Sequence, residues 1–442
     1  MKRFILEELE EWKVSESRKP LILRGARQVG KTWVMKEFGK SFKSVIYLNF
    51  EEKKTYKDFF KYSLDPFEIM NRLSMALNQK IDKDTLLIFD EIQECNDALN
   101  SLKYFCENAR EYYVISAGSL LGLSLANGFP VGKVDFIDMY PFTFSEFLIA
   151  TGNENLYEFL NSIERIENIP EFFYQRLCEK LKIYLTVGGM PEAVDVWIKK
   201  QSIDSLNKVQ KNILSAYETD FGKHLEGDFF KNDVNKIRLI WDTVSSQLSK
   251  ENKKFIYSQM KSGARAREYE NSLQWLVNAD LLKKIYKITK PGFPLKAYEE
   301  KNSFKLYHMD MGLLRRQVDL NHQVILEGDR LFQEFKGALT ENFVVQSLIA
   351  KLKVNPHYWS NQNYEVDLII QLDNQIIPIE IKSGKNISSP SLNEYKKLYA
   401  GVTPFVVRYS LNNLKLDGNV LNIPLFLIDR TEQLIRIAQK SI

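Results

Sequence analysis

The sequence has no long hydrophobic run, few cysteines and little excess charge, and each absence excludes a class of protein. No apolar stretch approaches the ~18 residues of a membrane-spanning helix, so we expect no membrane partner. Acidic residues follow the basic start of the chain too soon for a signal peptide. Three cysteines without metal-ligand spacing fit a reducing compartment, and we expect a cytoplasmic protein. A net charge of +4 permits a nucleic-acid partner but does not argue for one.

The 442 residues include 44% hydrophobic ones, which is enough to fill several cores, and no repeat interrupts the chain. Residues 20–150 alternate short apolar runs with helical patterns, which is typical of a parallel α/β sheet. The predicted strands of this sheet are 21–24, 45–50, 86–90, 112–116 and 134–139. We therefore assign residues 1–150 to an α/β core domain.

The rest of the chain divides into three predicted regions. Residues 151–230 read as a helical lid or linker, broken by the Gly- and Pro-containing cluster 186–191. Residues 231–302 read as helices followed by a hairpin of 281–289 and 295–298, a winged-helix pattern. Its basic residues either contact DNA phosphates or form a solvated face. Residues 303–442 read as a terminal α/β domain with strands at 364–371, 376–381 and 405–408.

A phosphate-binding loop follows the first predicted strand and precedes a predicted helix. In the pattern G-x-x-x-x-G-K-S/T, glycines let the backbone curl so that its N–H groups point at phosphate oxygens. The lysine reaches the β- and γ-phosphates, and the hydroxyl residue holds Mg²⁺. We predict an ATP site formed by Gly25, Ala26, Arg27, Gln28, Val29, Gly30, Lys31, Thr32 and Trp33.

Two acids end the third predicted strand, directly after the apolar run 86–89. In a phosphate-loop enzyme such acids hold the Mg²⁺ shell and polarise the attacking water. We give the first role to Asp90 and the second, catalytic one to Glu91. Ser119 follows the next strand, where it either senses the γ-phosphate or caps a helix.

Four segments occur in a characteristic order: RGARQVGKT at 24–32, FDEIQ at 89–93, AGS at 117–119 and YPFTFSEF at 140–147. Together they resemble the prokaryotic AAA-type ATPases that carry a C-terminal nuclease-like domain. The similarity extends through 188–192 and 309–314. This resemblance implies an ATPase core, a helical or winged-helix middle and a terminal PD-(D/E)XK domain, which is restriction-endonuclease-like. Such ATPases take an arginine from a neighbour or lid. The sequence does not identify that arginine, which favours a homo-oligomer.

The terminal region contains two strands around a two-residue turn at Asp373 and Asn374. With that turn, Asp367 lies directly opposite Glu380, at a spacing of ~5 Å where like charges are destabilising. The pair therefore favours a bound cation, and Mg²⁺ takes oxygen ligands of this kind. Lys382, on the same face, is placed to stabilise an attacking hydroxide or a phosphorane charge.

The arrangement resembles the metal site of PD-(D/E)XK phosphodiesterases, in which a preceding helix adds one more acid, here Glu341. The resemblance implies metal-assisted hydrolysis of a nucleic-acid backbone, with Asp367 and Glu380 as metal ligands and Lys382 as a further catalytic residue. One alternative is an exposed ribbon face with ordinary ion pairs, Glu365 with Lys382 and Glu380 with Lys385. Another is a domain that keeps the motif but only binds.

The sequence thus predicts an ATPase that couples nucleotide binding and hydrolysis to a nuclease-like domain acting on nucleic acid, preferably DNA. Its cofactors are ATP and Mg²⁺. One alternative is a regulatory NTPase switch whose terminal domain is a non-catalytic binding module. Another is a DNA-binding regulator with a vestigial ATP site.

Overall fold

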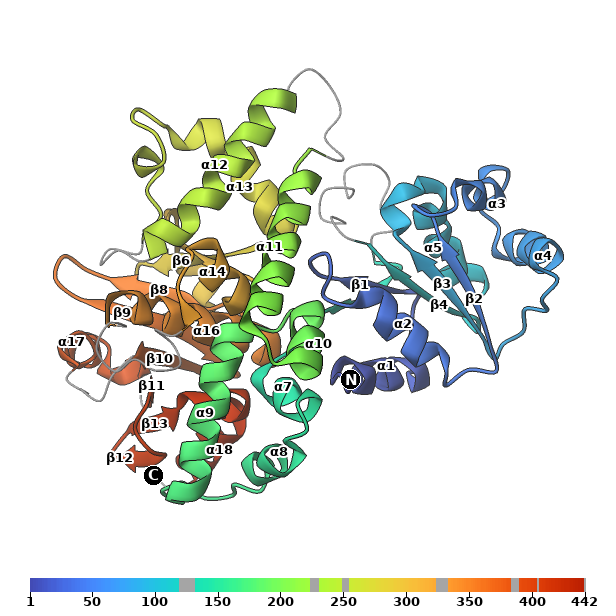
Figure 1. Ribbon diagram of the computed structural model, residues 1–442. Helices are drawn as coiled ribbons and strands as arrows, with labels where there is room; N and C mark the ends of the chain where they lie inside the picture. Colours follow the sequence, from blue (N-terminus) through green and yellow to red (C-terminus); the bar gives the residue numbers. More distant parts are fainter. Residues whose placement is uncertain are drawn as a thin grey trace. The chain divides into compact units, whose positions relative to one another are not determined.

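The computed structural model describes residues 1–118, 132–222, 230–248, 254–322, 333–382, 389–403 and 405–440 (Figure 1). These residues form two compact units. The N-terminal unit comprises Lys2–Tyr140 together with Asn278–Leu281. The second unit comprises Pro141–Val277 and Leu282–Ile442.

The N-terminal unit is built on a five-stranded parallel sheet with the order β2-β3-β4-β1-β5. All five predicted strands are confirmed, as β1 (Leu21–Arg24), β2 (Ser44–Asn49), β3 (Thr85–Asp90), β4 (Tyr113–Ala117) and β5 (Asp135–Asp138). The strand β3, which lies between β2 and β4, is buried along its whole length because its apolar run packs into the core. In this order β4 lies between β1 and β3, and all three strands run parallel. The loop after β1 and the acids at the end of β3 therefore emerge at the same edge of the sheet.

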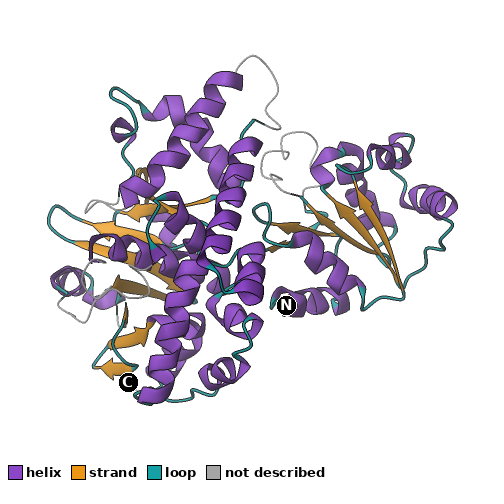
Figure 2. Cartoon of the chain, viewed as in Figure 1, coloured by secondary structure: helices purple, strands orange, loops and turns teal. Residues whose placement is uncertain are grey.

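The helices of this unit follow the strands as crossover connections, as a parallel sheet requires (Figure 2). In the connection between β2 and β3, Asp65 caps the N-terminus of a helix by accepting hydrogen bonds from the backbone N–H groups of Phe67 and Glu68. The helical elements are α1 (Ile5–Val14), α2 (Lys31–Gly39), η1 (Lys54–Lys57), α3 (Asp58–Lys61), α4 (Pro66–Leu77), η2 (Ile92–Glu94) and α5 (Asn96–Asn108).

The second unit begins with a run of helices, which confirms the helical pattern expected there. Gly188, at φ 77°, ends one helix and Pro191 starts the next, so the predicted breaker cluster makes a sharp connection. The helices of this part are α7 (Phe144–Ala150), α8 (Glu154–Asn161), α9 (Glu171–Val187), α10 (Pro191–Lys200), α11 (Ile203–Asp220), α12 (Phe230–Leu248), η3 (Tyr257–Gln259) and α13 (Ala266–Asn278).

An eight-stranded mixed sheet forms the rest of the second unit, with the order β12-β13-β11-β10-β9-β8-β6-β7. Its strands are β6 (Leu282–Ile288), β7 (Glu299–His308), β8 (His357–Ser360), β9 (Glu365–Leu372), β10 (Gln375–Ile381), β11 (Val406–Ser410), β12 (Lys415–Asp417) and β13 (Val420–Pro424). Its helical elements are η4 (Leu295–Tyr298), α14 (Met311–Gln317), α16 (Gln333–Leu352), α17 (Pro390–Leu398), η5 (Ala400–Val402), η6 (Leu425–Arg430) and α18 (Thr431–Gln439).

The predicted winged-helix hairpin has a different form and a different partner. Residues 295–298 form the short helix η4 and not a strand. At its start, the N–H of Leu295 donates to Gln371 Oε1 (3.1 Å). The returning strand β7 starts at Glu299 instead. In addition, β6 pairs in parallel with β8, so the hairpin belongs to the same sheet as the C-terminal strands. The expected boundary between residues 302 and 303 therefore falls inside β7.

The β9–β10 hairpin has the register that the sequence predicts. Ile377 pairs with Ile370 and Ile379 with Leu368, around a turn in which Asp373 has a φ of 50°. Both apolar pairs are buried. This places Asp367, Glu380 and their neighbours on the opposite face of the two strands.

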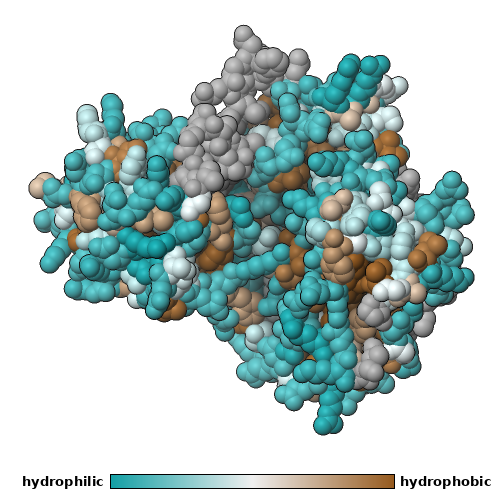
Figure 3. Space-filling model, turned by 180° about the vertical axis from the view of Figure 1, so that it is seen from behind, coloured by the Kyte–Doolittle hydropathy of each residue, from teal (hydrophilic) through white to brown (hydrophobic). Residues whose placement is uncertain are grey.

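The face of the molecule drawn in Figure 3 is mainly hydrophilic, with hydrophobic residues interspersed. Within the described ranges, no helix combines the length and the apolar character that a membrane crossing requires.

Candidate functional site

The phosphate-binding loop runs from the end of β1 to the start of α2. Its backbone has positive φ at Gly25 (140°), Gln28 (64°) and Gly30 (98°). A Cβ atom on Gly25 would lie 2.2 Å from the carbonyl oxygen of Met139, so glycine is required there on both conformational and steric grounds. Gly30 is the residue before α2, which begins at Lys31. The loop therefore has the curled backbone that turns N–H groups toward an anion at a helix N-terminus.

Lys31 lies over this loop with its ammonium group buried. Its Nζ donates hydrogen bonds to the carbonyl oxygens of Gly25 (2.7 Å) and Ala26 (2.8 Å). Burial lowers the pKa of Lys31 to about 8, although the carboxylates of Glu91, Asp90 and Asp280 act in the opposite direction. A buried ammonium bonded to two loop carbonyls is placed to donate to a phosphate oxygen that enters the loop.

ATP affinity is expected to fall as the pH rises through the pKa of Lys31. The burial-lowered pKa of about 8 means that the free protein loses the Lys31 charge in mildly alkaline solution. We expect affinity to drop roughly tenfold between about pH 7 and about pH 9. Calorimetric titration with ATP across this range measures the effect. Lys31→Met is the control, and an equally steep pH dependence in that variant would contradict the assignment.

Thr32 and Asp90 form the side of the site that suits a metal ion. Thr32 Oγ1 donates to Asp90 Oδ2 (2.7 Å), which confirms that the sheet brings the loop and the acidic strand together. Tyr47, on β2, donates its hydroxyl to the same oxygen (2.8 Å). Burial raises the pKa of Tyr47, so it stays a donor. A hydroxyl and a carboxylate in contact are the oxygen ligands that Mg²⁺ prefers, and the residues present fit that ion.

Glu91 directly follows β3 in a left-handed conformation, with φ 50° and ψ 48°. Its Oε2 accepts a hydrogen bond from Gln93 Nε2 (2.6 Å), which fixes the direction of the carboxylate. Its own N–H donates to Asp90 Oδ1 (3.1 Å), so the backbone of Glu91 is tied to the neighbouring carboxylate. A left-handed non-glycine residue stores strain, and such strain clusters at functional sites.

The remaining residues of the predicted ATP site differ in exposure. Val29 is buried, and its carbonyl accepts a hydrogen bond from Arg3 Nη1 (3.1 Å). Arg27 lies with Nη2 4.0 Å from Glu51 Oε2. Trp33 is 42% exposed on α2. Ser119 lies outside the described residues.

Three residues that contact the predicted ATP site are not among the predicted site residues. Arg3 joins the loop to the chain after β5, because its Nη2 also donates to the carbonyl of Tyr140 (2.7 Å). Tyr47 and Gln93 hold the two acids. Tyr47 sits near the carboxyl end of a predicted strand and Gln93 lies two residues from Glu91, signals that could have raised both. Arg3 has no such signal.

In the second unit, a buried lysine lies among the carboxylates predicted for the nuclease-like site. Lys305, on β7, places Nζ 2.6 Å from Glu365 Oε1 and 3.2 Å from Glu341 Oε1. Glu341 also accepts a hydrogen bond from the hydroxyl of Tyr307. Burial alone would lower the pKa of Lys305, yet Glu341, Glu365 and Asp367 outweigh it and raise that pKa. The amine is therefore charged.

Glu380 belongs to a separate set of contacts. Its Oε1 lies 2.9 Å from Lys382 Nζ, and its Oε2 lies 3.4 Å from Arg408 Nε and accepts from Ser389. Asp367 Oδ2 accepts the N–H of Ile381 (2.8 Å). Asp367 and Glu380 thus have different donors, and a cation shared by the two carboxylates stays a prediction.

The alternative prediction, an exposed ribbon face with ordinary ion pairs, is contradicted by the burial of Glu380. Glu380 and Glu341 are only 6% and 1% exposed, and Glu365 pairs with Lys305 instead of Lys382. Lys385 lies outside the described residues. In the part of the chain that is described, no group of three or more His, Cys, Asp or Glu side chains is placed to hold a metal ion.

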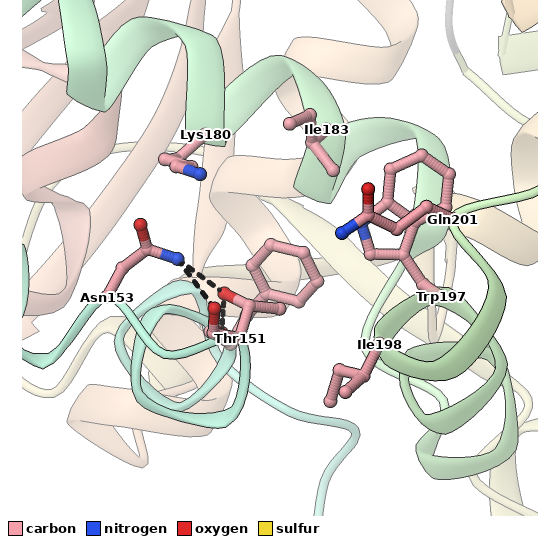
Figure 4. A pocket seen from close by; sticks show the side chains of 8 residues that line it. Thr151, Asn153, Lys180, Ile183, Trp197, Ile198 and Gln201 are labelled. Carbon is pink, nitrogen blue, oxygen red and sulfur yellow. Dashed lines mark hydrogen bonds between the residues drawn. The ribbon is translucent and has the colours of Figure 1, made fainter.

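A hollow in the second unit offers less chemistry (Figure 4). Two of its polar residues bond each other, because Asn153 Nδ2 donates to the carbonyl and the hydroxyl of Thr151, both at 3.0 Å. The lining residues are Phe147, Thr151, Asn153, Lys180, Ile183, Trp197, Ile198 and Gln201. We therefore assign no site there.

Comparison with other protein sequences gives matches to part of this chain. The chain is similar to the uncharacterized proteins Mb2031c of Mycobacterium bovis and Rv2008c of Mycobacterium tuberculosis, each 33% identical over 105 residues. That stretch covers 23% of this chain and only 22% of each relative.

Solved structures with some likeness include Aeropyrum pernix ORC1 in complex with DNA, at a TM-score of 0.30 and 11% identity, covering 71% of this chain and 90% of that one. Another is AMPPCP-bound DnaA from Aquifex aeolicus, at a TM-score of 0.28 and 14% identity, covering 63% and 86%. These scores are low, so the fold assignment rests on strand order and family matches.

Three family models match successive parts of the chain. Residues 178–323 match a domain of unknown function, DUF8612, and residues 336–427 match another, DUF4143. Residues 17–148 match the AAA domain, and they contain the loop of Lys31, the acid pair of Asp90 and Glu91, and all five parallel strands. Over these residues the N-terminal unit is similar to AAA-type P-loop domains.

Proposed function

We propose that the N-terminal unit binds ATP with Mg²⁺ and hydrolyses it. The observation that carries this proposal is the hydrogen bond from Thr32 Oγ1 to Asp90 Oδ2 (2.7 Å), next to the buried ammonium of Lys31. Residues from the start of α2 and the end of β3 meet there in the combination that phosphoryl transfer needs. The AAA family match supports the same function.

Each residue then has a defined task. Lys31 exchanges two loop carbonyls for the phosphate oxygens of ATP, which bring a full negative charge to the buried ammonium. Thr32 and Asp90 would hold Mg²⁺, which neutralises charge on the phosphates when bound. Glu91, aimed by Gln93, orients the attacking water and accepts its proton.

Lys31→Ala is expected to weaken ATP binding by at least about tenfold, since a charge-assisted hydrogen bond contributes about 1.5–3 kcal/mol. Calorimetric titration of the full chain with ATP and Mg²⁺ measures the loss. Lys40→Ala is the matched control, because Lys40 follows the same helix and its exposed ammonium pairs only locally with Glu37 (2.6 Å). Wild-type ATP affinity in Lys31→Ala would refute the proposal.

We further propose that the nucleotide state controls how the second unit engages nucleic acid. Exposed basic side chains near α13 support a phosphate-contacting surface, namely Lys261, Arg265 and Arg267. Coupling to nucleic-acid cleavage and self-assembly of the chain stay predictions. The non-catalytic alternative for the C-terminal region is favoured by one observation, the pairing of its carboxylates with internal cations.

A further inference from the structure

The strand β7 carries a lysine into the carboxylate cluster of the predicted nuclease site. Lys305 and Tyr307 alternate with apolar residues along β7, so both reach the same face of the sheet. Glu341 of α16 meets them there, and Glu365 comes from the start of β9. Lys305 Nζ also lies 4.8 Å from the ring centre of Tyr358. Tyr358 is on β8, which lies between β9 and the β6–β7 hairpin in the sheet.

This lysine is fully buried and has two carboxylate partners. Its side chain is 0% exposed, that of Glu341 is 1% exposed, and that of Glu365 is 38% exposed. The contact distances of 3.2 Å and 2.6 Å are those of direct charge-assisted hydrogen bonds. A divalent cation entering the cluster would meet a fixed positive charge already bonded to the same oxygens.

Glu380, which is a predicted metal ligand, contacts cations other than Lys305. Glu380 has Lys382 on one oxygen and Arg408 and Ser389 on the other. Arg408 is itself buried and bonds Asn422 as well, which holds the guanidinium in place. Glu341 and Glu365 thus contact Lys305, whereas Glu380 contacts Lys382 and Arg408.

We propose that the ammonium of Lys305 replaces a divalent metal in this cluster, so that the C-terminal region is a metal-independent module that does not cut nucleic acid. The carboxylates instead join β7, α16 and β9 through one buried ion network. This inference concerns the second unit and is independent of ATP hydrolysis by the first.

Mn²⁺ without nucleotide is the probe, because it favours the oxygen ligands that Mg²⁺ uses. Full-length wild type and Asp367→Asn are titrated with Mn²⁺, and free Mn²⁺ is followed by electron paramagnetic resonance. We expect superimposable isotherms, since any weak binding at Asp90 is common to both proteins. A bound Mn²⁺ that is present in wild type and lost in Asp367→Asn would overturn the proposal.

A second arm removes the lysine. Without its ammonium, Glu341, Glu365 and Asp367 are left in need of a cation, so Mn²⁺ should raise the Tm of Lys305→Ala by several degrees. Wild type and Lys305→Arg, which keeps the charge, should show no such shift. A folded Lys305→Ala protein with a Tm indifferent to Mn²⁺ would sink the idea. If Lys305→Ala does not fold, the Asp367→Asn isotherm decides alone.

Discussion

Glu91→Gln is expected to lower the ATP turnover rate by about 10²- to 10⁴-fold while ATP still binds, because the amide cannot accept the proton of the attacking water. Lys31, Thr32 and Asp90 remain in place in this variant, so the affinity for ATP should stay near that of wild type. Phosphate release under saturating ATP measures turnover, and calorimetry measures affinity.

Glu94→Gln is the matched control for this experiment. Glu94 ends the short helix η2, which Glu91 precedes, and its Oε2 lies 3.8 Å from Lys57 Nζ. Its substitution should leave turnover within about twofold of wild type, as expected for a surface ion pair. Normal turnover in Glu91→Gln would transfer the base role to another residue. The same trapped protein also tests coupling, since its affinity for DNA should differ with and without ATP.

Lys305→Met is expected to lower the free energy of unfolding of the second unit by about 3–5 kcal/mol, because it leaves buried carboxylates without their cation. The methionine nearly matches the lysine stem in length, so the loss reports charge more than packing. Denaturant unfolding measures it. The double variant Lys305→Met/Glu341→Gln should lose less than the sum of the two single variants, since the pair interacts directly.

The chain offers a close control in Lys287→Met. Lys287 is also a strand lysine, and it pairs with Glu300 across β6 and β7 at 3.2 Å, but that pair is partly exposed. Such a pair contributes about 0–1 kcal/mol. Equal losses in Lys287→Met and Lys305→Met would show that burial of the network has no special weight.

Prediction from the sequence works best for features formed by residues that are close together in the chain. The phosphate loop depends on residues that are adjacent in the chain, and the acids of β3 follow directly from a buried apolar run. The β9–β10 register likewise follows from one turn and a period of two. In these places, short-range geometry alone determines which side chains meet.

Prediction fails where a residue acts on a distant segment. Nothing near Lys305 marks it as a partner of Glu365, which lies 60 positions later. Arg3 reaches the loop across 26 positions. The hairpin of β6 and β7 has the local pattern of a wing, and only its pairing with β8 shows that it continues a larger sheet. Tertiary hydrogen bonding decides these cases, and no periodicity encodes it.

The strand β7 has a consequence for how this protein can be divided or recombined. A gene fragment that starts after His308 would leave out the edge hairpin, bare the flank of β8 to other chains, and strip Glu341 and Glu365 of their counter-charge. We therefore expect a C-terminal fragment to need the preceding hairpin in order to complete its sheet.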